Sequence, residues 1–395
     1  MTTARFSLRR RFGRCMPFAL LALIVSACGQ VQPSSGAYSG AWTSHRLGLP
    51  AGSRIATLDP TRHLIWIANC PVSDIDLDAR PALFRFDINS GDVSMFNVPV
   101  FCSGPSVRAP FGVKGSLRTD SAGNVWFLSG WKLVKFTPST SDFGAWDVAG
   151  KPSIPVTSLR TPAADVAILT FPAGIVLGDD GTVWVRVLQT PALQGFVPAA
   201  QSWRLLSVGG LVSTQEMPFL SDGHGKLILG TTSATAGNAV RIIDPVTGVV
   251  TQTSVRPGQF AVTSDGGIAF VDDNGQLMKH SIATGRTEGV GFILKGSPAE
   301  GSHYYRRIGI RSAPDGLWLL DGPNAAEDGI VNFDRVDLKS SSVRTIAVPD
   351  VRFNGAGYRA PGGAGGLMFD SNGTAWLPTT GVAREQRPEL YSLAP

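Results

Sequence analysis

The chain has 395 residues, and its 46 glycines and 27 prolines are scattered at turn positions, as a many-stranded protein needs. Its length alone allows two or three domains or one large all-β unit. Of its 35 basic and 30 acidic residues, five arginines and no acid lie in residues 1–27, so the remaining chain is formally neutral. The charge therefore excludes a general affinity for nucleic acid or anionic lipid.

Residues 1–27 have the pattern of a targeting segment. Arginines between Arg5 and Arg14 precede the apolar run Met16–Ala27, which is too short to span a bilayer comfortably. The run ends in V-S-A-C, which resembles the lipobox of bacterial lipoproteins. The resemblance implies cleavage before Cys28, acylation of Cys28, and a place in the cell envelope on the periplasmic or outer-membrane side. An ordinary secretory signal is the alternative.

Residues 28–38 are predicted to be the lipidated cysteine and a flexible tether, and residues 39–395 a single domain. The repeated feature of this domain is a polar turn followed by a short apolar strand. It is clearest in D-S-A-G-N-V-W-F-L at Asp120–Leu128 and returns as D-S-N-G-T-A-W-L at Asp370–Leu377. The glycine supplies the positive φ of a tight turn, and the apolar run suits a strand buried on both faces.

Seven copies of this feature can be aligned on the position of the tryptophan. That position, called the Trp slot below, is occupied by Trp66, Trp126, Trp184, Ile228, Ala269, Trp318 and Trp376. The spacings run from 41 residues (228 to 269) to 60 residues (66 to 126). They agree with propeller blades of about 40–50 residues plus loop insertions.

Each copy is expected to sit in a unit of four strands. One strand precedes the turn, as at Arg54–Leu58, Gln259–Thr263 and Arg307–Arg311, and two strands follow the Trp slot around a hairpin turn. In the third unit these two strands are predicted at Trp203–Leu206 and Val212–Met217.

The last unit lacks an outer strand, because the chain stops shortly after Leu390–Leu393. Ala41–Leu49, which precedes the first unit, reads as an outer strand without a unit. The predicted fold class is thus an all-β, seven-bladed β-propeller closed by an N-terminal strand that completes the last blade. An open β-sandwich or two separate domains are the alternatives.

Phe171–Arg186 reads F-P-A-G-I-V-L-G-D-D-G-T-V-W-V-R. With the other copies, it resembles the repeat of the streptogramin (virginiamycin B) lyase-like propellers, P-x-G-I-x-x-G-x-D-G-x-x-W-F, whose wider relatives are the NHL-like and YncE-like propellers. The resemblance covers about residues 39–395 and implies seven blades, a central channel and a ligand face built from loops. The lyases use a histidine and glutamates with magnesium, but none of the five histidines here stands at a matching repeat position, so the resemblance implies the fold and not the lyase activity.

Two cysteines remain after the lipidated one, Cys70 and Cys102, both in the first unit. In an oxidising compartment they are most simply a disulfide, with two separate buried thiols as the alternative. No histidine pattern accompanies them, so no metal or cofactor is predicted.

Loops that join one blade's outer strand to the next blade's inner strand lie at a propeller's channel mouth, where function concentrates. Three are longer or richer than a turn requires, namely Gly104–Arg118, Gly296–Arg307 and Phe353–Gly366. Their candidate ligand residues are Arg108, Lys114, Glu300, His303, Tyr304, Arg306, Tyr358 and Arg359. The plainer alternative is solvated loops whose arginines pair with neighbouring aspartates.

The sequence favours a lipid-anchored, monomeric and non-enzymatic module that binds a protein or small molecule. The alternative is a streptogramin lyase-like or hydrolase-type enzyme with Glu300 and His303 as a proton-transfer pair at the channel mouth.

Overall fold

The strands were located in a computed structural model of the chain. It describes residues 41–49, 53–70, 82–98, 117–129, 131–149, 172–188, 190–209, 211–212, 218–233, 237–255, 260–272, 274–293, 309–314, 316–321, 332–347, 367–378 and 390–395. These residues belong to one compact unit, Pro33–Pro395. Regular structure in the described part of the chain is entirely β, and no helix there is long and apolar enough to cross a membrane.

The first three sheets follow the chain in order. Blade 1 consists of β2 (Ser53–Asp59), β3 (Leu64–Cys70), β4 (Ala82–Asp87) and β5 (Val93–Asn97). Blade 2 consists of β6 (Arg118–Thr119), β7 (Val125–Ser129), β8 (Lys132–Thr137) and β9 (Asp142–Asp147). Blade 3 consists of β10 (Pro172–Leu177), β11 (Val183–Val187), β12 (Ala192–Val197) and β13 (Ser202–Ser207).

The next three sheets continue the series. Blade 4 consists of β14 (Leu211–Val212), β15 (Phe219–Ser221), β16 (Leu227–Ser233), β17 (Gly237–Ile243) and β18 (Val250–Gln252). Blade 5 consists of β19 (Phe260–Val262), β20 (Ile268–Val271), β21 (Gln276–His280) and β22 (Thr287–Ile293). Blade 6 consists of β23 (Gly309–Ala313), β24 (Gly316–Asp321), β25 (Asn332–Val336) and β26 (Val343–Ala347).

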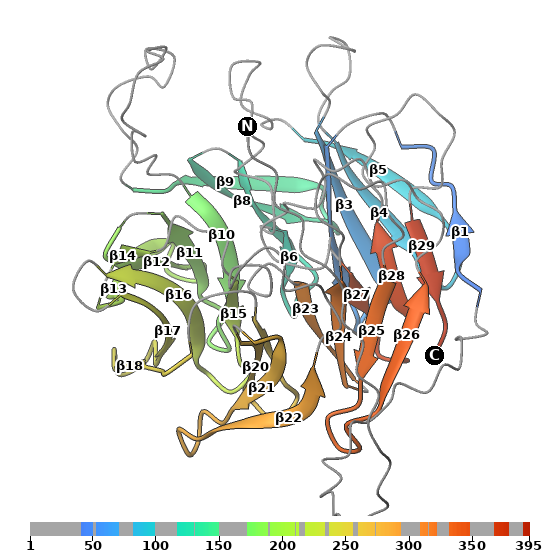
Figure 1. Cartoon of the computed structure of the whole chain (residues 1–395). Coiled ribbons are helices and arrows are strands. Elements are labelled where there is room, and N and C mark those ends of the chain that lie inside the picture. The colour runs from blue at the N-terminus through green and yellow to red at the C-terminus, as the bar shows by residue number, and fades with distance from the viewer. Residues whose placement is uncertain are drawn as a thin grey trace, which may run out of the picture. The chain divides into compact units, whose positions relative to one another are not determined.

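Blade 7 draws on both ends of the described chain (Figure 1). It consists of β27 (Met368–Phe369), β28 (Ala375–Pro378), β29 (Leu390–Leu393) and β1 (Thr43–His45). β1 runs antiparallel to β29, with Thr43 opposite Ser392 and His45 opposite Leu390. β1 is shorter than the expected strand Ala41–Leu49. That this strand closes the ring stays a prediction.

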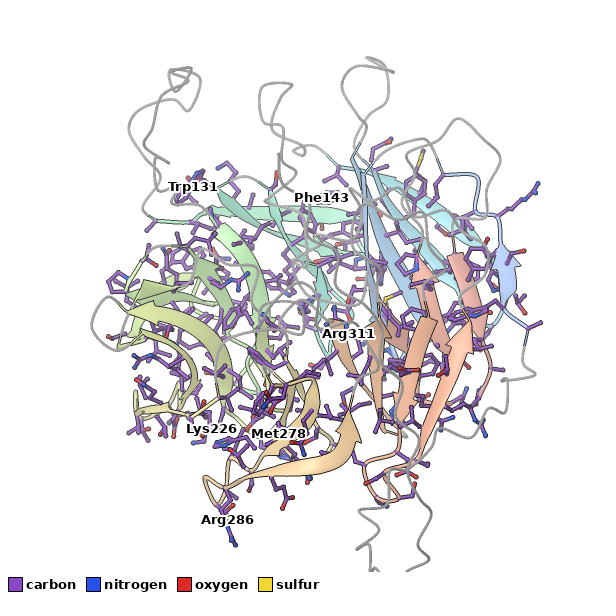
Figure 2. All side chains as sticks on the ribbon, in the orientation of Figure 1. Trp131, Phe143, Lys226, Met278, Arg286 and Arg311 are labelled. Atoms are coloured by element: carbon purple, nitrogen blue, oxygen red, sulfur yellow. The ribbon has the colours of Figure 1, made fainter. Side chains whose placement is uncertain are left out.

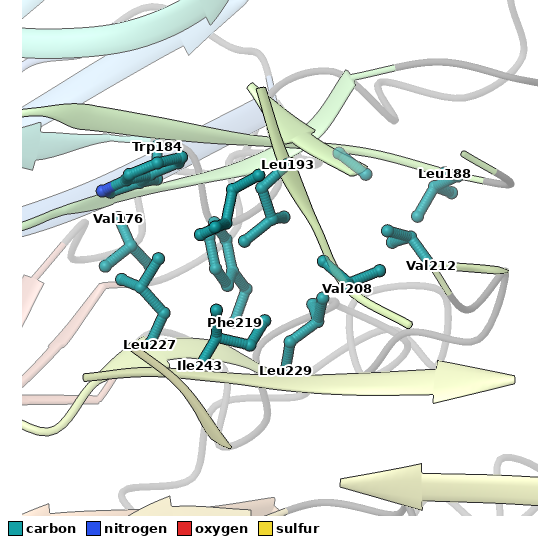
Figure 3. Close-up of a cluster of buried hydrophobic side chains, with 12 residues drawn as sticks. Val176, Trp184, Leu188, Leu193, Val208, Val212, Phe219, Leu227, Leu229 and Ile243 are labelled. Carbon is teal, nitrogen blue, oxygen red and sulfur yellow. The ribbon is translucent and has the colours of Figure 1, made fainter. Parts of the chain in front are cut away.

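Seven hydrophobic clusters lie between the seven sheets, one for each pair of consecutive blades. Figure 3 shows the cluster between blades 3 and 4, where Trp184 and Leu193 face Leu227 and Ile243. The cluster that joins blade 7 to blade 1 packs Trp376 against Ile65 and its neighbours. Because blade 7 packs on blade 1 as each other blade packs on the next, the sheets form a ring, and the seven-bladed β-propeller is confirmed.

The Trp slot explains why the repeat is visible in the sequence. β7 is buried along its whole length, which confirms the expected strand covered on both faces. Trp66, Trp126, Trp184, Trp318 and Trp376 are all buried, and each belongs to the cluster that its blade shares with the next blade. These tryptophans are therefore the wedges that fill the space between blades.

The aspartate of the clearest repeat holds the turn and the tryptophan together. One Asp120 carboxylate oxygen accepts a hydrogen bond from the backbone N–H of Asn124 (2.9 Å), and the other accepts one from Trp126 Nε1 (2.8 Å). Asp370 does the same for the last repeat, where it accepts from Thr374 N (2.9 Å) and Trp376 Nε1 (3.1 Å).

Asp120→Ala is therefore expected to destabilise the protein by about 2–4 kcal/mol, because it leaves the buried indole N–H of Trp126 without a partner and removes the acceptor of the turn. Asp142→Ala, at an exposed position of β9 in the same blade, is the matched control and should change stability by less than about 0.5 kcal/mol. Urea unfolding followed by tryptophan fluorescence measures both. Equal midpoints for the two variants would contradict the bridging role of Asp120.

The expected strands of the third unit were wrong in their order. The strand after the Trp slot is β12, whereas Trp203–Leu206 lies in the outermost strand, β13, and Leu211–Val212 joins blade 4 as β14. β12 reads as a loop because Gln194 and Gly195 lie at its centre. A Cβ at Gly195 would approach the ring of Trp184 to 2.7 Å, so the close packing of that tryptophan requires glycine there. The Gln194 amide bonds both the N–H and the C=O of Ala149 (2.9 Å each), which satisfies it inside the sheet packing.

Candidate functional site

The two ends of the ring are built differently. At the turn end, the first and second strands of each blade are joined by short turns, such as 120–124 and 370–374. Neighbouring turns contact one another there, since Arg62 donates to the Ser121 carbonyl oxygen (2.6 Å) and lies over Gly123. A Cβ at Gly266 would likewise meet the His224 ring at 3.1 Å. At the turn end, therefore, short turns with internal hydrogen bonds contact their neighbours in at least two places around the ring.

The opposite end, the loop end, receives the connections from each outer strand to the next innermost strand. Antiparallel pairing throughout each sheet places all of these strand ends on that side. The long connections 98–117, 148–171, 294–308 and 348–367 begin and finish there. The eight candidate ligand residues of the sequence analysis fall within these connections: Arg108, Lys114, Glu300, His303, Tyr304, Arg306, Tyr358 and Arg359. All eight lie outside the described residues.

The cysteine predictions also lie outside what the structure describes. Cys28 and Cys102 are beyond the described ranges, and of Cys70 only the backbone, at the end of β3, is described. The disulfide and the lipidation stay predictions. Among the described ranges, no group of three or more His, Cys, Asp or Glu side chains is arranged to hold a metal ion.

The described residues do contain charged groups at the hub, the name used here for the seven innermost strands β2, β6, β10, β15, β19, β23 and β27. Neighbouring innermost strands contact one another from β2 round to β23, and β27 contacts β2. On each innermost strand one residue pairs with the Trp slot. These seven positions form one level of the hub: Thr57, Arg118, Val176, Leu220, Ala261, Arg311 and Met368.

Two of the seven positions at this level are arginines, Arg118 on blade 2 and Arg311 on blade 6. Figure 2 shows Arg311 among the innermost strands, near the middle of the view. Both side chains are half-buried. Arg118 donates from Nη1 to the Leu117 carbonyl oxygen (2.8 Å), which fixes one edge of its guanidinium against its own strand.

The positive charge of Arg118 affects the pKa of Arg311. Burial lowers the pKa of Arg118, and burial followed by the positive charge of Arg118 lowers the pKa of Arg311 to about 10. Blades 2 and 6 share no packing cluster, because each of the seven clusters joins consecutive blades. Arg118 and Arg311 therefore do not share a blade interface.

A third arginine reaches the inner strand of blade 3 from the second strand. Arg186 on β11 lies opposite Gly174 and donates from Nη2 to the Ala173 carbonyl oxygen (3.2 Å). Its side chain is buried, and a Cβ at Gly174 would lie in ordinary van der Waals contact with the guanidinium, at 3.8 Å.

The sequence analysis missed Arg118 and Arg311 as site residues, because it placed Arg118 at the end of a loop and Arg311 at the end of a strand. A signal was present. The residue seven to nine positions before the Trp slot is small, apolar or threonine in five repeats and arginine in two. The charges of Arg118 and Arg311 stand at a position that is uncharged in the other five repeats, so the fold itself does not require them.

Comparison with solved structures finds other propellers. A streptogramin B lyase aligns with a TM-score of 0.57 and 14% identity over 89% of this chain and 97% of its own. Selenomethionine-substituted virginiamycin B lyase from Staphylococcus aureus aligns with a TM-score of 0.57 and 13% identity over 90% and 99% of the two chains. The WD40 repeats of RRP9 align with a TM-score of 0.56 and 10% identity over 92% and 98%.

These likenesses establish the fold and leave activity open, because sequence identity this low does not carry function across a common scaffold. No model of a protein family matches the chain, and no curated protein matches it either. The expected resemblance to the streptogramin lyase-like propellers is confirmed at the level of fold.

Proposed function

We propose that this protein is a lipid-anchored, monomeric β-propeller of the bacterial envelope that binds a protein or small-molecule ligand without transforming it. The observation that supports this proposal is the contrast between the two ends of the ring. The turn end consists of short turns with internal backbone hydrogen bonds, whereas the long connections with charged and aromatic residues start and finish at the loop end. A rigid ring that carries variable connections on one side is the usual arrangement of a binding scaffold.

The anchor is proposed to be the lipid on Cys28, with residues 28–38 as a tether to the ring. Such an anchor holds a protein of neutral surface charge at a membrane that it would not otherwise approach. In a bacterial host, the protein should partition into the detergent phase of a Triton X-114 extract, and Cys28→Ser should move it to the aqueous phase. Equal partitioning of the two would argue against the anchor.

The second candidate is an enzyme of the lyase or hydrolase type, and the observation that favours it is the fold shared with streptogramin B lyase. Glu300 and His303 would be its proton-transfer pair. The two candidates differ in what happens when this pair is removed.

The experiment compares the unmodified protein with the double variant Glu300→Gln/His303→Ala in panels of lyase and hydrolase substrates, with and without magnesium. The binding proposal expects no turnover in either protein and no effect of magnesium on the melting temperature. A control, Glu288→Gln, changes an exposed acid of β22 that precedes the same connection. Turnover that disappears in the double variant and persists in the control would establish the enzyme and overturn the binding-only proposal.

A further inference from the structure

We propose that Arg241 is an oxyanion-binding site at the interface of blades 3 and 4, where its guanidinium group takes one carboxylate or phosphate group of a ligand. The site lies on the third strand of blade 4, outside the hub and apart from the loop residues considered above. It goes beyond the proposed function, because it depends neither on the lipid anchor nor on a ligand at the loop end.

The first step in the argument is position. Arg241 lies on β17, opposite Leu229 of β16 and two residues before Ile243. Side chains that are paired across a sheet, or that lie two residues apart along a strand, point to the same face. Leu229 and Ile243 belong to the cluster between blades 3 and 4 that Figure 3 shows. The side chain of Arg241 therefore projects from blade 4 towards blade 3.

The second step is the way in which the guanidinium group is held. Its Nε donates to Thr231 Oγ1 (2.8 Å), and this hydroxyl donates in turn to the Ala239 carbonyl oxygen (3.3 Å). Its Nη1 lies beside Gly209, between β13 and β14, since a Cβ there would approach Nη1 to 2.8 Å. A hydroxyl of blade 4 thus fixes one edge of the group, and a glycine that follows blade 3 makes room for another.

The third step is the missing counter-charge. Arg241 is only 8% exposed, and an arginine as buried as this is ordinarily paired with an acid. Among the residues that the structure describes, none forms an ion pair with Arg241, and its guanidinium group donates a single hydrogen bond, to Thr231. Nη1 and Nη2 keep contact with solvent, whereas Arg204 Nε, for example, is fully enclosed. An anion from solution can therefore reach the unbonded donors of Arg241 and balance its charge.

The ligand chemistry follows from the edge that is left open. Because Thr231 occupies Nε, the open edge is the one formed by Nη1 and Nη2. Its two N–H groups match two oxygens of a carboxylate or a phosphate and form short, charge-assisted hydrogen bonds with them. Gln252 is exposed and lies opposite Arg241 on β18, so its amide can donate to the same anion. The class is therefore a ligand that presents one oxyanion group.

The test measures thermal unfolding of the full-length protein while acetate or, separately, inorganic phosphate replaces chloride at constant ionic strength. A saturable rise in the melting temperature is expected with at least one probe. Arg241→Gln should weaken the apparent affinity by about tenfold or more, since it removes charge-assisted hydrogen bonds. Arg286→Gln is the matched control, because Arg286 is exposed and extends from the surface in Figure 2, and it should leave the affinity within about twofold.

Gln252→Glu tests the same site without removing the arginine, and it decides the question if Arg241→Gln does not fold. A carboxylate opposite Arg241 should occupy the open edge from within the sheet. It should raise the melting temperature in chloride and weaken the affinity for the added anion by about tenfold or more. Thr251→Glu adds the same charge at an exposed position on the other face of β18, so it is the matched control and should leave the affinity within about twofold.

The two probes distinguish the sources of the oxyanion group. Tighter binding of acetate would assign a carboxylate ligand, and tighter binding of phosphate a phosphorylated one. Absence of a saturable effect of both probes at concentrations on the order of 100 mM would overturn the site. Equal effects in Arg241→Gln, Gln252→Glu and the two controls would also overturn it, because exclusion of an anion from the protein surface stabilises every variant alike.

Discussion

Gly316→Ala is expected to lower the free energy of unfolding by about 4 kcal/mol or more, which puts it among the most damaging single substitutions in the ring. Gly316 begins β24 and pairs with Ala313, so it forms the tight end of the hairpin between the first and second strands of blade 6. Its φ is +144°, a conformation that residues with a side chain rarely adopt.

The backbone of the third strand makes the position still more restrictive. A Cβ at Gly316 would overlap the carbonyl oxygen of Val336 and would lie 3.2 Å from its carbonyl carbon. Val336 is fully buried and pairs with Leu317, so its carbonyl cannot move away without breaking the ladder between β24 and β25. Backbone strain of about 1–3 kcal/mol and the loss of this packing therefore add together.

Gly91→Ala separates the two contributions. Gly91 also has a positive φ, +77°, but a Cβ there would meet no atom within 4 Å. It should cost only about 1 kcal/mol, from the backbone conformation alone. Urea unfolding of both variants, followed by tryptophan fluorescence, measures the difference. Similar midpoints for the two would mean that the approach of Val336 to Gly316 relaxes without cost.

The repeat could be found in the sequence because its most visible residue has the same physical task in most blades. In five of the seven blades, a tryptophan after the turn fills the space between one sheet and the next at the same position along the strand. Ile228 and Ala269 fill the slot in blades 4 and 5 and lie in the same kind of cluster. The number of blades therefore follows from the sequence, as do the innermost strands of blades 1, 5 and 6 to within about two residues.

The strand order of blade 3 did not follow, because a propensity-based reading takes glycine and glutamine as signs of a loop. Gly195 is a strand residue, because the ring of Trp184 lies against it, and Gln194 is a strand residue that bonds the backbone of the preceding connection. Tertiary packing decides both positions, and local sequence contains no trace of it.

The hub arginines illustrate a different limit. Their residue types are visible in the sequence, but a charged residue at the end of a predicted loop or strand is ordinarily interpreted as solvated. Only the register, which pairs both of them with the Trp slot, places them at one level of one ring. The equivalence of two positions nearly 200 residues apart in the sequence can be recognised only once the topology is known.

The N-terminal strand carries the second large prediction, that removing residues before 50 will open the ring. The segment 42–49 contacts both interfaces of blade 7. Trp42 packs in the cluster between blades 6 and 7, with its ring 6.2 Å from that of Phe333, whereas Leu49 is buried in the cluster between blades 7 and 1. His45 bridges the same interface, with its ring 5.3 Å from Trp376 in blade 7 and 5.6 Å from Phe86 in blade 1.

A chain that begins at residue 50 is expected to lose about 4 kcal/mol or more of stability relative to one that begins at residue 39. Loss of the buried Leu49 side chain from the cluster between blades 7 and 1 alone accounts for about 1.5–3 kcal/mol of this stability. The pairing of β1 with β29 is lost in addition. The free edge of β29 should also promote self-association, which light scattering detects. A chain that begins at residue 33 differs from the reference only in the tether and should match it in stability.

Acid should weaken the same contact, and the sign follows from His45. Burial lowers its pKa in the folded protein, and its Nε2 lies 2.8 Å from Ser392 Oγ in blade 7. The unfolded chain takes up a proton at His45 near pH 6.5 while the folded chain resists it, so this contribution is present above pH 6.5 and is lost as the pH falls towards the folded-state pKa. His45→Gln should remove this contribution to the pH dependence, because glutamine can keep a hydrogen bond to Ser392 without titrating.

If the chain that begins at residue 50 unfolded at the same urea concentration as the one that begins at residue 39, the packing of blade 7 on blade 1 would be sufficient to close the ring. The N-terminal strand would then be an edge cover and not a latch.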